Sequence, residues 1–161
     1  TAQIRNLFDN IKHYSQRGDN LYSIIAGLEN SFISELILED NFRKDLEKLF
    51  VSFYEAGKPS SAVCHSTTLL LEAKKSNGEL LVKGKTWTGF ADAEEEFADK
   101  AVGMKIQPYR IEDEAKKIAG TTFKVAAPFS AYAIADGNLI TGQQQNSGAA
   151  AAELLVKMLS K

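Results

Sequence analysis

A cysteine and a histidine stand side by side at the end of an apolar segment, and no other pair in the chain is better suited to nucleophilic chemistry. Cys64 is the only cysteine in the sequence, and His65 follows it directly. Small residues precede the pair and hydroxyl residues follow it, which is typical of a sharp turn from a buried strand into a helix. The free amides and the dipole at the start of such a helix favour a thiolate, so we expect the pKa of the Cys64 thiol to be lowered. His65 can support that ionisation or relay protons.

A second interpretation of Cys64 is an inert core residue, because free cysteine is among the most buried residue types. The pattern around it favours the reactive interpretation. Ala62 and Val63 complete a short apolar strand, and Ser66 begins a polar turn before the apolar helical stretch.

The elements that must position this pair alternate between strand and helix, which predicts an α/β fold with a mainly parallel sheet. A short buried strand is predicted at residues 21–26. A helix is predicted to start at Asp40 and to end before Gly57 and Pro59, and the strand that leads to Cys64 follows at once.

The second half of the chain continues the alternation. We expect a strand at residues 86–90 that leads into an acidic segment at 93–97, and a helix at 111–118. Asp136-Gly137-Asn138 is a strong hairpin signal, and residues 147–159 form an alanine-rich helix whose apolar face packs on the sheet. Residues 1–20 hold no apolar strand, so the chain looks like the later part of a doubly wound domain, N-terminally shortened or with its first strands elsewhere.

Length and composition predict one soluble domain that spans residues 1–161, with residues 1–20 divergent. The net charge of −2, with 25% charged and 44% hydrophobic residues, argues against nucleic acid or an anionic membrane surface as partner. No apolar run is long enough to span a membrane, and from the polar start we expect no signal peptide. We therefore expect a cytoplasmic protein. One cysteine allows no internal disulfide.

Several ordered motifs carry a family resemblance: Gly57-Lys58-Pro59 before Ala62-Val63-Cys64-His65, then Leu81-Val82-Lys83-Gly84-Lys85 before Thr88-Gly89-Phe90-Ala91-Asp92-Ala93-Glu94-Glu95, then Ile111-Glu112-Asp113-Glu114, and finally Asp136-Gly137-Asn138-Leu139-Ile140-Thr141-Gly142-Gln143. On these motifs the chain resembles the ThiJ/PfpI superfamily of the class I glutamine-amidotransferase-like fold. It is most similar to the glyoxalase III and stress-chaperone branch.

The resemblance implies a flavodoxin-like sandwich that forms a homodimer, with a catalytic cysteine at Cys64, an adjacent histidine at His65, and an acidic third member at Glu95 or Glu94. A carboxylate there could orient the imidazole and stabilise its charged form. An acidic helix start that is only solvated is the alternative for the run of glutamates.

Three departures from the family pattern affect the expected site. The family's glycine-rich loop, which would offer amides to an oxyanion, corresponds here to Gly27 followed by Leu28, Glu29 and Asn30. Ser66 replaces the usual glycine after the histidine and could cap the helix start. No stretch corresponds to the family's first strand with its glutamate; Glu29 is a candidate substitute. We therefore take Gly27, Glu29 and Ser66 as the expected substrate or oxyanion contacts.

The function implied by the resemblance is a stress enzyme without a cofactor, either glyoxalase III-like or deglycase-like, that uses the cysteine on small reactive carbonyls or glycated protein. The alternatives are a non-catalytic redox-stress or chaperone protein that binds unfolded protein, and a PfpI-type cysteine peptidase. We expect no metal site, because His13 stands alone and soft ligands are few. Residues 142–148 are either a polar rim of the active-site cleft or a simple helix entry. Trp87 is expected in the core.

Overall fold

The computed structural model describes residues 40–160, and the predicted strand at residues 21–26 lies outside them. Helices and strands alternate through most of the described chain. In chain order the elements are α3 (Asp40–Glu55), β1 (Ser60–Val63), the 3-10 helix η1 (Cys64–Leu71), β2 (Thr86–Trp87), α4 (Asp92–Val102), α5 (Ile111–Lys117), β3 (Thr122–Phe123), β4 (Ala133–Asp136), β5 (Leu139–Gly142), the 3-10 helix η2 (Gln145–Ser147) and α6 (Gly148–Leu159).

The described strands form two small sheets. Three strands pair in the order β1-β5-β4, and β2 pairs with β3 in a separate two-stranded sheet. The β1–β5 and β2–β3 pairs are parallel, whereas β4–β5 is antiparallel. The predicted α/β alternation is therefore present, with parallel pairs at β1–β5 and β2–β3 and the predicted hairpin at β4–β5, but the described strands form two small sheets and the larger one is mixed.

One local feature and one set of long-range contacts explain this arrangement. The connection from β4 to β5 is the tight turn at Gly137, whose φ of +63° a glycine adopts easily, and such a turn joins antiparallel strands. Side chains link the sheets where backbone pairing would otherwise continue: Asp136 Oδ2 accepts from the Thr86 amide at 2.8 Å, and Thr141 Oγ1 accepts from the Thr88 amide at 3.0 Å. Polar side chains of β4 and β5 thus satisfy the amide of Thr86 in β2 and the amide of Thr88 just after it, without a backbone ladder between the two sheets.

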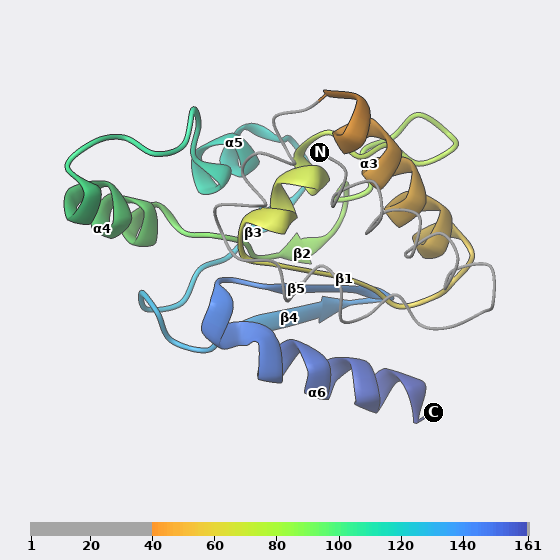
Figure 1. The fold of residues 1–161 in the computed structure, drawn as a ribbon. Helices are drawn as coiled ribbons and strands as arrows, with labels where there is room; N and C mark the ends of the chain where they lie inside the picture. Colours follow the sequence, from red (N-terminus) through yellow and green to blue (C-terminus); the bar gives the residue numbers. More distant parts are fainter. Residues whose placement is uncertain (1–39, 161) are drawn as a thin grey trace.

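Helices cover both faces of the β1-β5-β4 sheet (Figure 1). Helix α6 lies along one face, and α3 and η1 lie on the other. Ala151 on α6 is buried, and Leu154, Leu155 and Met158 pack against the core, which confirms the predicted inner face of this helix. None of the described helices is long and apolar enough to cross a membrane.

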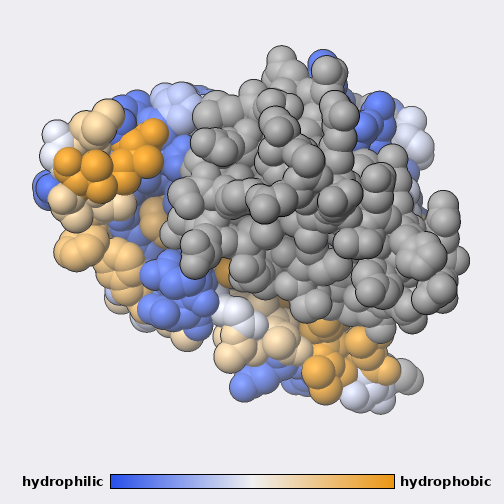
Figure 2. Space-filling view, viewed as in Figure 1, coloured by the Kyte–Doolittle hydropathy of each residue, from blue (hydrophilic) through white to orange (hydrophobic). Residues whose placement is uncertain are grey.

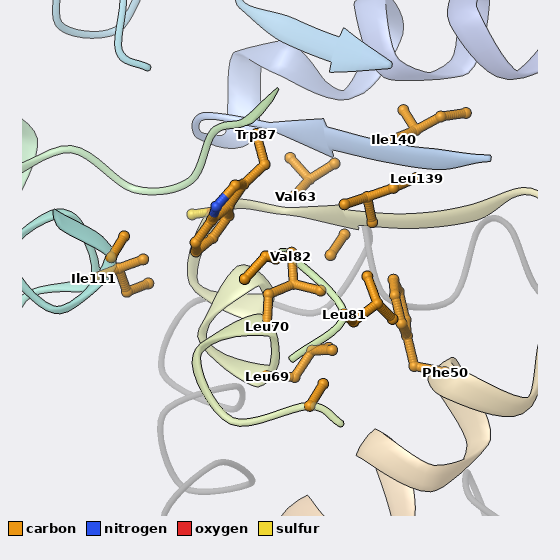
Figure 3. Close-up of a cluster of buried hydrophobic side chains, with 14 of the residues drawn as sticks. Phe50, Val63, Leu69, Leu70, Leu81, Val82, Trp87, Ile111, Leu139 and Ile140 are labelled. Carbon is orange, nitrogen blue, oxygen red and sulfur yellow. The ribbon is translucent and has the colours of Figure 1, made fainter. Parts of the chain in front are cut away.

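The apolar core lies between η1, α3 and the strands (Figure 3). Val63 on β1, Leu139 and Ile140 on β5, and Leu70 on η1 belong to this cluster. Trp87 is fully buried and stacks edge-on against Phe123 at 4.7 Å between ring centroids, as expected for a core residue. Because β1 and η1 supply core side chains on both sides of residue 64, the core fixes the turn between them.

Candidate active site

The turn after β1 holds Cys64 in a backbone conformation that residues with side chains rarely adopt. Its φ is +64°, which costs on the order of 1–3 kcal/mol for a residue other than glycine. Two hydroxyl groups hold the turn in place. Ser66 Oγ donates to the Val63 carbonyl at 2.6 Å and accepts from the Val63 amide at 2.9 Å, and Thr67 Oγ1 donates to the Cys64 carbonyl at 2.6 Å. The predicted sharp turn is confirmed, and the helix that follows is a 3-10 helix.

These contacts give Ser66 a defined position. Its hydroxyl caps the start of η1 from inside the turn, in agreement with the capping role predicted from the sequence. Its role as a substrate or oxyanion contact stays a prediction. Gly27 and Glu29, the other two expected contacts, lie outside the described residues.

A continuous chain of contacts joins the sulfur to an acidic side chain. Cys64 Sγ lies 3.3 Å from His65 Nδ1, and His65 Nε2 lies 2.8 Å from Glu95 Oε1. The three residues are buried, with exposed fractions of 5%, 8% and 2% in that order. Phe90 covers the imidazole, with 4.2 Å between the ring centroids. The geometry is that of a cysteine, a base and a group that orients the base.

The carboxylate decides which nitrogen of His65 carries the proton. An ionised Glu95 can only accept a hydrogen bond, so in the neutral imidazole the proton sits on Nε2, where it is donated to Glu95. Nδ1 is then unprotonated and faces the sulfur. His65 is therefore oriented to take a proton from the Cys64 thiol, and Glu95 is placed to stabilise the imidazolium that results.

The thiol itself is harder to ionise than the sequence predicts. Burial raises the pKa of Cys64 to about 12, and the negative charges of Glu94 and Glu95 act in the same direction. Backbone hydrogen bonds from His65 and Gln145 lower the pKa, but they are outweighed. The expected lowering of the thiol pKa is therefore wrong for this structure, because desolvation of a charged sulfur exceeds what the amides at the helix start provide.

The two neighbouring glutamates that the sequence left as alternatives have different surroundings. Glu94 is fully buried, and its carboxylate accepts from the amides of Ala91 at 3.0 Å and Phe129 at 2.8 Å and from Gln143 Nε2 at 2.9 Å. Glu94 thus joins the start of α4 to the segment around Phe129. Only Glu95 of the two has a described contact with His65.

Some groups at the site carried too weak a signal in the sequence. Gln143 and Gln144 are fully buried, whereas Gln145 and Asn146 are exposed. The segment is the entry to η2 and α6, and Gln144 caps η2; a rim of the active-site cleft stays a prediction. A backbone hydrogen bond from Gln145 lowers the pKa of the Cys64 thiol. The position of residues 142–148 at the end of a strand was the available signal, but it did not reveal burial. Within residues 40–160, no cluster of three or more His, Cys, Asp or Glu side chains is arranged to hold a metal ion.

Comparison with known proteins finds relatives of one family. No protein-family model matches the chain. A probable glutathione-independent glyoxalase of Schizosaccharomyces pombe is 34% identical over 119 residues, which are 71% of this chain and 46% of that protein. Glyoxalase 3 of Candida albicans is 30% identical over 146 residues, or 89% of this chain and 61% of that protein. The chain is homologous to the glutathione-independent glyoxalase III family.

Structural similarity agrees with this homology to the glyoxalase III family. The crystal structure of glyoxalase III from Candida albicans matches with a TM-score of 0.60 and 30% identity, over 71% of this chain and 48% of that one. A 24 kDa rapid encystment protein of Francisella tularensis, 23% identical, matches with a TM-score of 0.62 over 76% of this chain and 51% of that one, which shows the shared fold alone. The resemblance to the glyoxalase III branch of the ThiJ/PfpI superfamily is confirmed. The chain spans about half the length of the curated relatives it matches.

Proposed function

We propose that this chain carries the cysteine centre of a glutathione-independent glyoxalase, which converts a small 2-oxoaldehyde such as methylglyoxal into a hydroxy acid. The observation that carries the proposal is the contact chain from Cys64 through His65 to Glu95, with distances of 3.3 and 2.8 Å. Homology to glyoxalase III proteins supports the choice of substrate class.

In the first step the Cys64 sulfur attacks the aldehyde carbon while its proton passes to His65 Nδ1. Since the pKa of the buried thiol is raised to about 12, a free thiolate is scarce near neutral pH. Proton transfer to His65 during the attack avoids that scarcity. Glu95 then faces an imidazolium at 2.8 Å, and this contact strengthens as the positive charge develops.

The remaining steps move hydrogen within the substrate. His65 returns its proton to the new alkoxide, which gives a hemithioacetal. Loss of a proton from the carbon that bears the sulfur, with a proton gained by the ketone oxygen, gives an enediol. Return of a proton to the neighbouring carbon, with loss of the hydroxyl proton from the carbon that bears the sulfur, converts the former ketone into an alcohol and the former aldehyde into a thioester. Water then releases the hydroxy acid and restores the thiol. The oxidation of one carbon is balanced by reduction of the other, so this proposed reaction needs no redox cofactor.

Substitution of the cysteine tests the proposal. Cys64→Ala removes the nucleophile, so we expect it to abolish conversion of methylglyoxal to lactate by the 161-residue chain. Glu96→Gln is the matched control, because Glu96 is next to Glu95 but lies on the surface, where it pairs with Arg110 at 3.1 Å. Turnover that survives Cys64→Ala would eliminate the cysteine mechanism, and an inactive unsubstituted chain would eliminate the function.

The proposal includes the organisation implied by the family. Residues 1–161 form one ThiJ/PfpI-like domain, a flavodoxin-like sandwich, which works as a homodimer. The described α/β alternation with helices on both faces of a sheet supports the sandwich. Light scattering of the chain measures the dimer directly, and a monomer that is fully active would remove this part of the proposal.

A chaperone-type function is a second candidate, favoured by an apolar surface on and after α4. Four large apolar residues there have exposed fractions between 45% and 65%: Phe97, Val102, Met104 and Ile106. Apolar side chains are seen together over the α4 end of the molecule in Figure 2. Unfolded proteins bind to such surfaces. Suppression of client aggregation by the Cys64→Ala variant, lost on Phe97→Ser, would support this function, and no suppression by the unsubstituted chain would exclude it.

A further inference from the structure

Strand pairing places the turn after β5 next to the turn after β1. The parallel register aligns Val63 with Gly142, so both strands end at the same edge of the sheet. A Cβ on Gly142 would lie 3.0 Å from Val63 Cγ1 and 3.0 Å from Ser147 Cβ, which shows how closely the two turns approach. Residues 143–147 are therefore neighbours of Cys64, although some 80 positions separate them in the chain.

Buried side chains hold this second turn in one shape. The Gln144 carboxamide accepts from the Asn146 amide at 2.5 Å and donates to the Ser130 carbonyl at 2.9 Å. Ser147 Oγ lies 3.2 Å from the amides of both Gln144 and Tyr132 and accepts from them. Gln144 is fully buried. Two carboxamide bonds and one hydroxyl thus fix the peptide that precedes Gln145.

The fixed peptide places the Gln145 N–H group at the edge of the sheet where the turns after β1 and β5 meet. As backbone hydrogen-bond donors, His65 and Gln145 both lower the pKa of the Cys64 thiol. The side chain of Gln145 is exposed, so its contribution here is made by the backbone. Two amides from separate turns that converge on one atom form an anion-binding concavity.

We propose that the Gln145 amide is the second donor of an anion hole for the Cys64 sulfur, and that Gln144 is the positioning residue that holds this amide in place. The hole stabilises the negative charge on sulfur whenever the thiol proton leaves, in the attack and again when the thioester is broken. The inference deepens the proposed function, but its first test measures the thiol alone and does not depend on the substrate.

Proline at position 145 removes the N–H group with little change to the backbone. Gln145 is the first residue of η2, where proline is tolerated, and the preceding Gln144 is extended, with φ −153° and ψ −174°, outside the helical region that a following proline disfavours. Gln145→Ala is the matched control, because it removes the exposed side chain and keeps the N–H. The rate of Cys64 alkylation by iodoacetamide is measured for both variants between about pH 7 and 9, below the thiol pKa.

The expected result is slower alkylation of Gln145→Pro than of Gln145→Ala. Loss of a hydrogen bond to the charged sulfur should raise the thiol pKa by roughly one to two units, which lowers the fraction of thiolate at fixed pH. A thiolate of higher pKa is also more nucleophilic, and this offsets part of the loss, so the alkylation rate should fall roughly 3- to 15-fold. A merely disrupted turn would expose the sulfur and speed the reaction. Equal or faster alkylation of Gln145→Pro, with circular dichroism that shows a folded protein, overturns the inference.

Gln144→Leu is the second variant, and it decides the result if Gln145→Pro does not fold. It removes both hydrogen bonds of the carboxamide without adding charge, and we expect slower alkylation than for the unsubstituted chain. An unchanged or faster rate overturns the inference.

Methylglyoxal turnover separates this inference from the proposed function. Slower alkylation in a chain that never turns over methylglyoxal supports the anion hole and removes the function. Unchanged alkylation of the variants, in a chain that does turn over methylglyoxal, supports the function and removes the anion hole.

Discussion

Replacing Glu95 by glutamine tests whether the contact with His65 contributes to chemistry or only to structure. Glutamine keeps the size of the side chain but removes its negative charge. The Nε2–Oε1 contact is 2.8 Å long, and both residues are buried, so little solvent replaces the lost carboxylate. In the proposed mechanism His65 becomes positively charged only after it takes the thiol proton. Loss of the carboxylate therefore destabilises the transition state more than the resting enzyme.

The size of the effect follows from that contact. A hydrogen bond to a charged group contributes about 1.5–3 kcal/mol, and each 1.36 kcal/mol of transition-state stabilisation is a factor of ten in rate. We therefore expect Glu95→Gln to lower kcat/KM for methylglyoxal roughly 10- to 150-fold. The same substitution should lower the pKa of the Cys64 thiol, because the Glu95 charge is one of the causes that raise it.

The assay therefore has two readouts, kcat/KM for methylglyoxal and the alkylation rate of Cys64 at fixed pH. For Glu95→Gln we expect lower turnover with alkylation that is no slower. Glu94→Gln is the matched control, since Glu94 is the preceding residue and equally buried but binds Ala91, Phe129 and Gln143. It should lower the melting temperature and leave turnover within a few-fold. Unchanged turnover in Glu95→Gln, or a parallel fall of turnover and alkylation, would refute the reasoning.

Two further predictions concern stability. Gly89→Ala would place a Cβ 2.2 Å from Thr67 Oγ1, inside the turn at Cys64, so we expect a loss of roughly 1–3 kcal/mol in the free energy of unfolding, measured with urea. Gly148→Ala is the control and should not destabilise, because a Cβ there meets nothing within 4 Å. Equal effects of the two substitutions would contradict the close packing at Gly89. Burial, with the charges of Glu112 and Asp113, raises the pKa of Asp92 to about 6. The folded state then binds more protons than the unfolded state above pH 4, so this contribution to stability is lost as pH rises through about 6. Asp92→Asn should therefore raise the melting temperature relative to the unsubstituted chain more at pH 7 than at pH 4. A constant difference would show that Asp92 does not cause a loss of stability over this pH range.

Local patterns in the sequence were enough to predict most of the described elements. The spacing of apolar residues predicted α3 and α6, and the turn at Gly137 predicted the hairpin of β4 and β5. These features depend on residues close together in the chain. The division into two sheets depends instead on Asp136 and Thr141, whose side chains bind amides 50 and 53 positions away. No local pattern carries that information.

The sequence by itself determined that Cys64 and His65 are adjacent and that a strand ends before them, since both follow from neighbours in the chain. Only the tertiary structure decided which glutamate meets His65. Residues 94 and 95 are successive positions of α4 and point about 100° apart, so the packing of that helix selects Glu95. Tertiary packing also decided that the pKa of the Cys64 thiol is raised. The local helix start favours a thiolate, but burial of the sulfur outweighs it, because desolvation depends on everything that surrounds the sulfur.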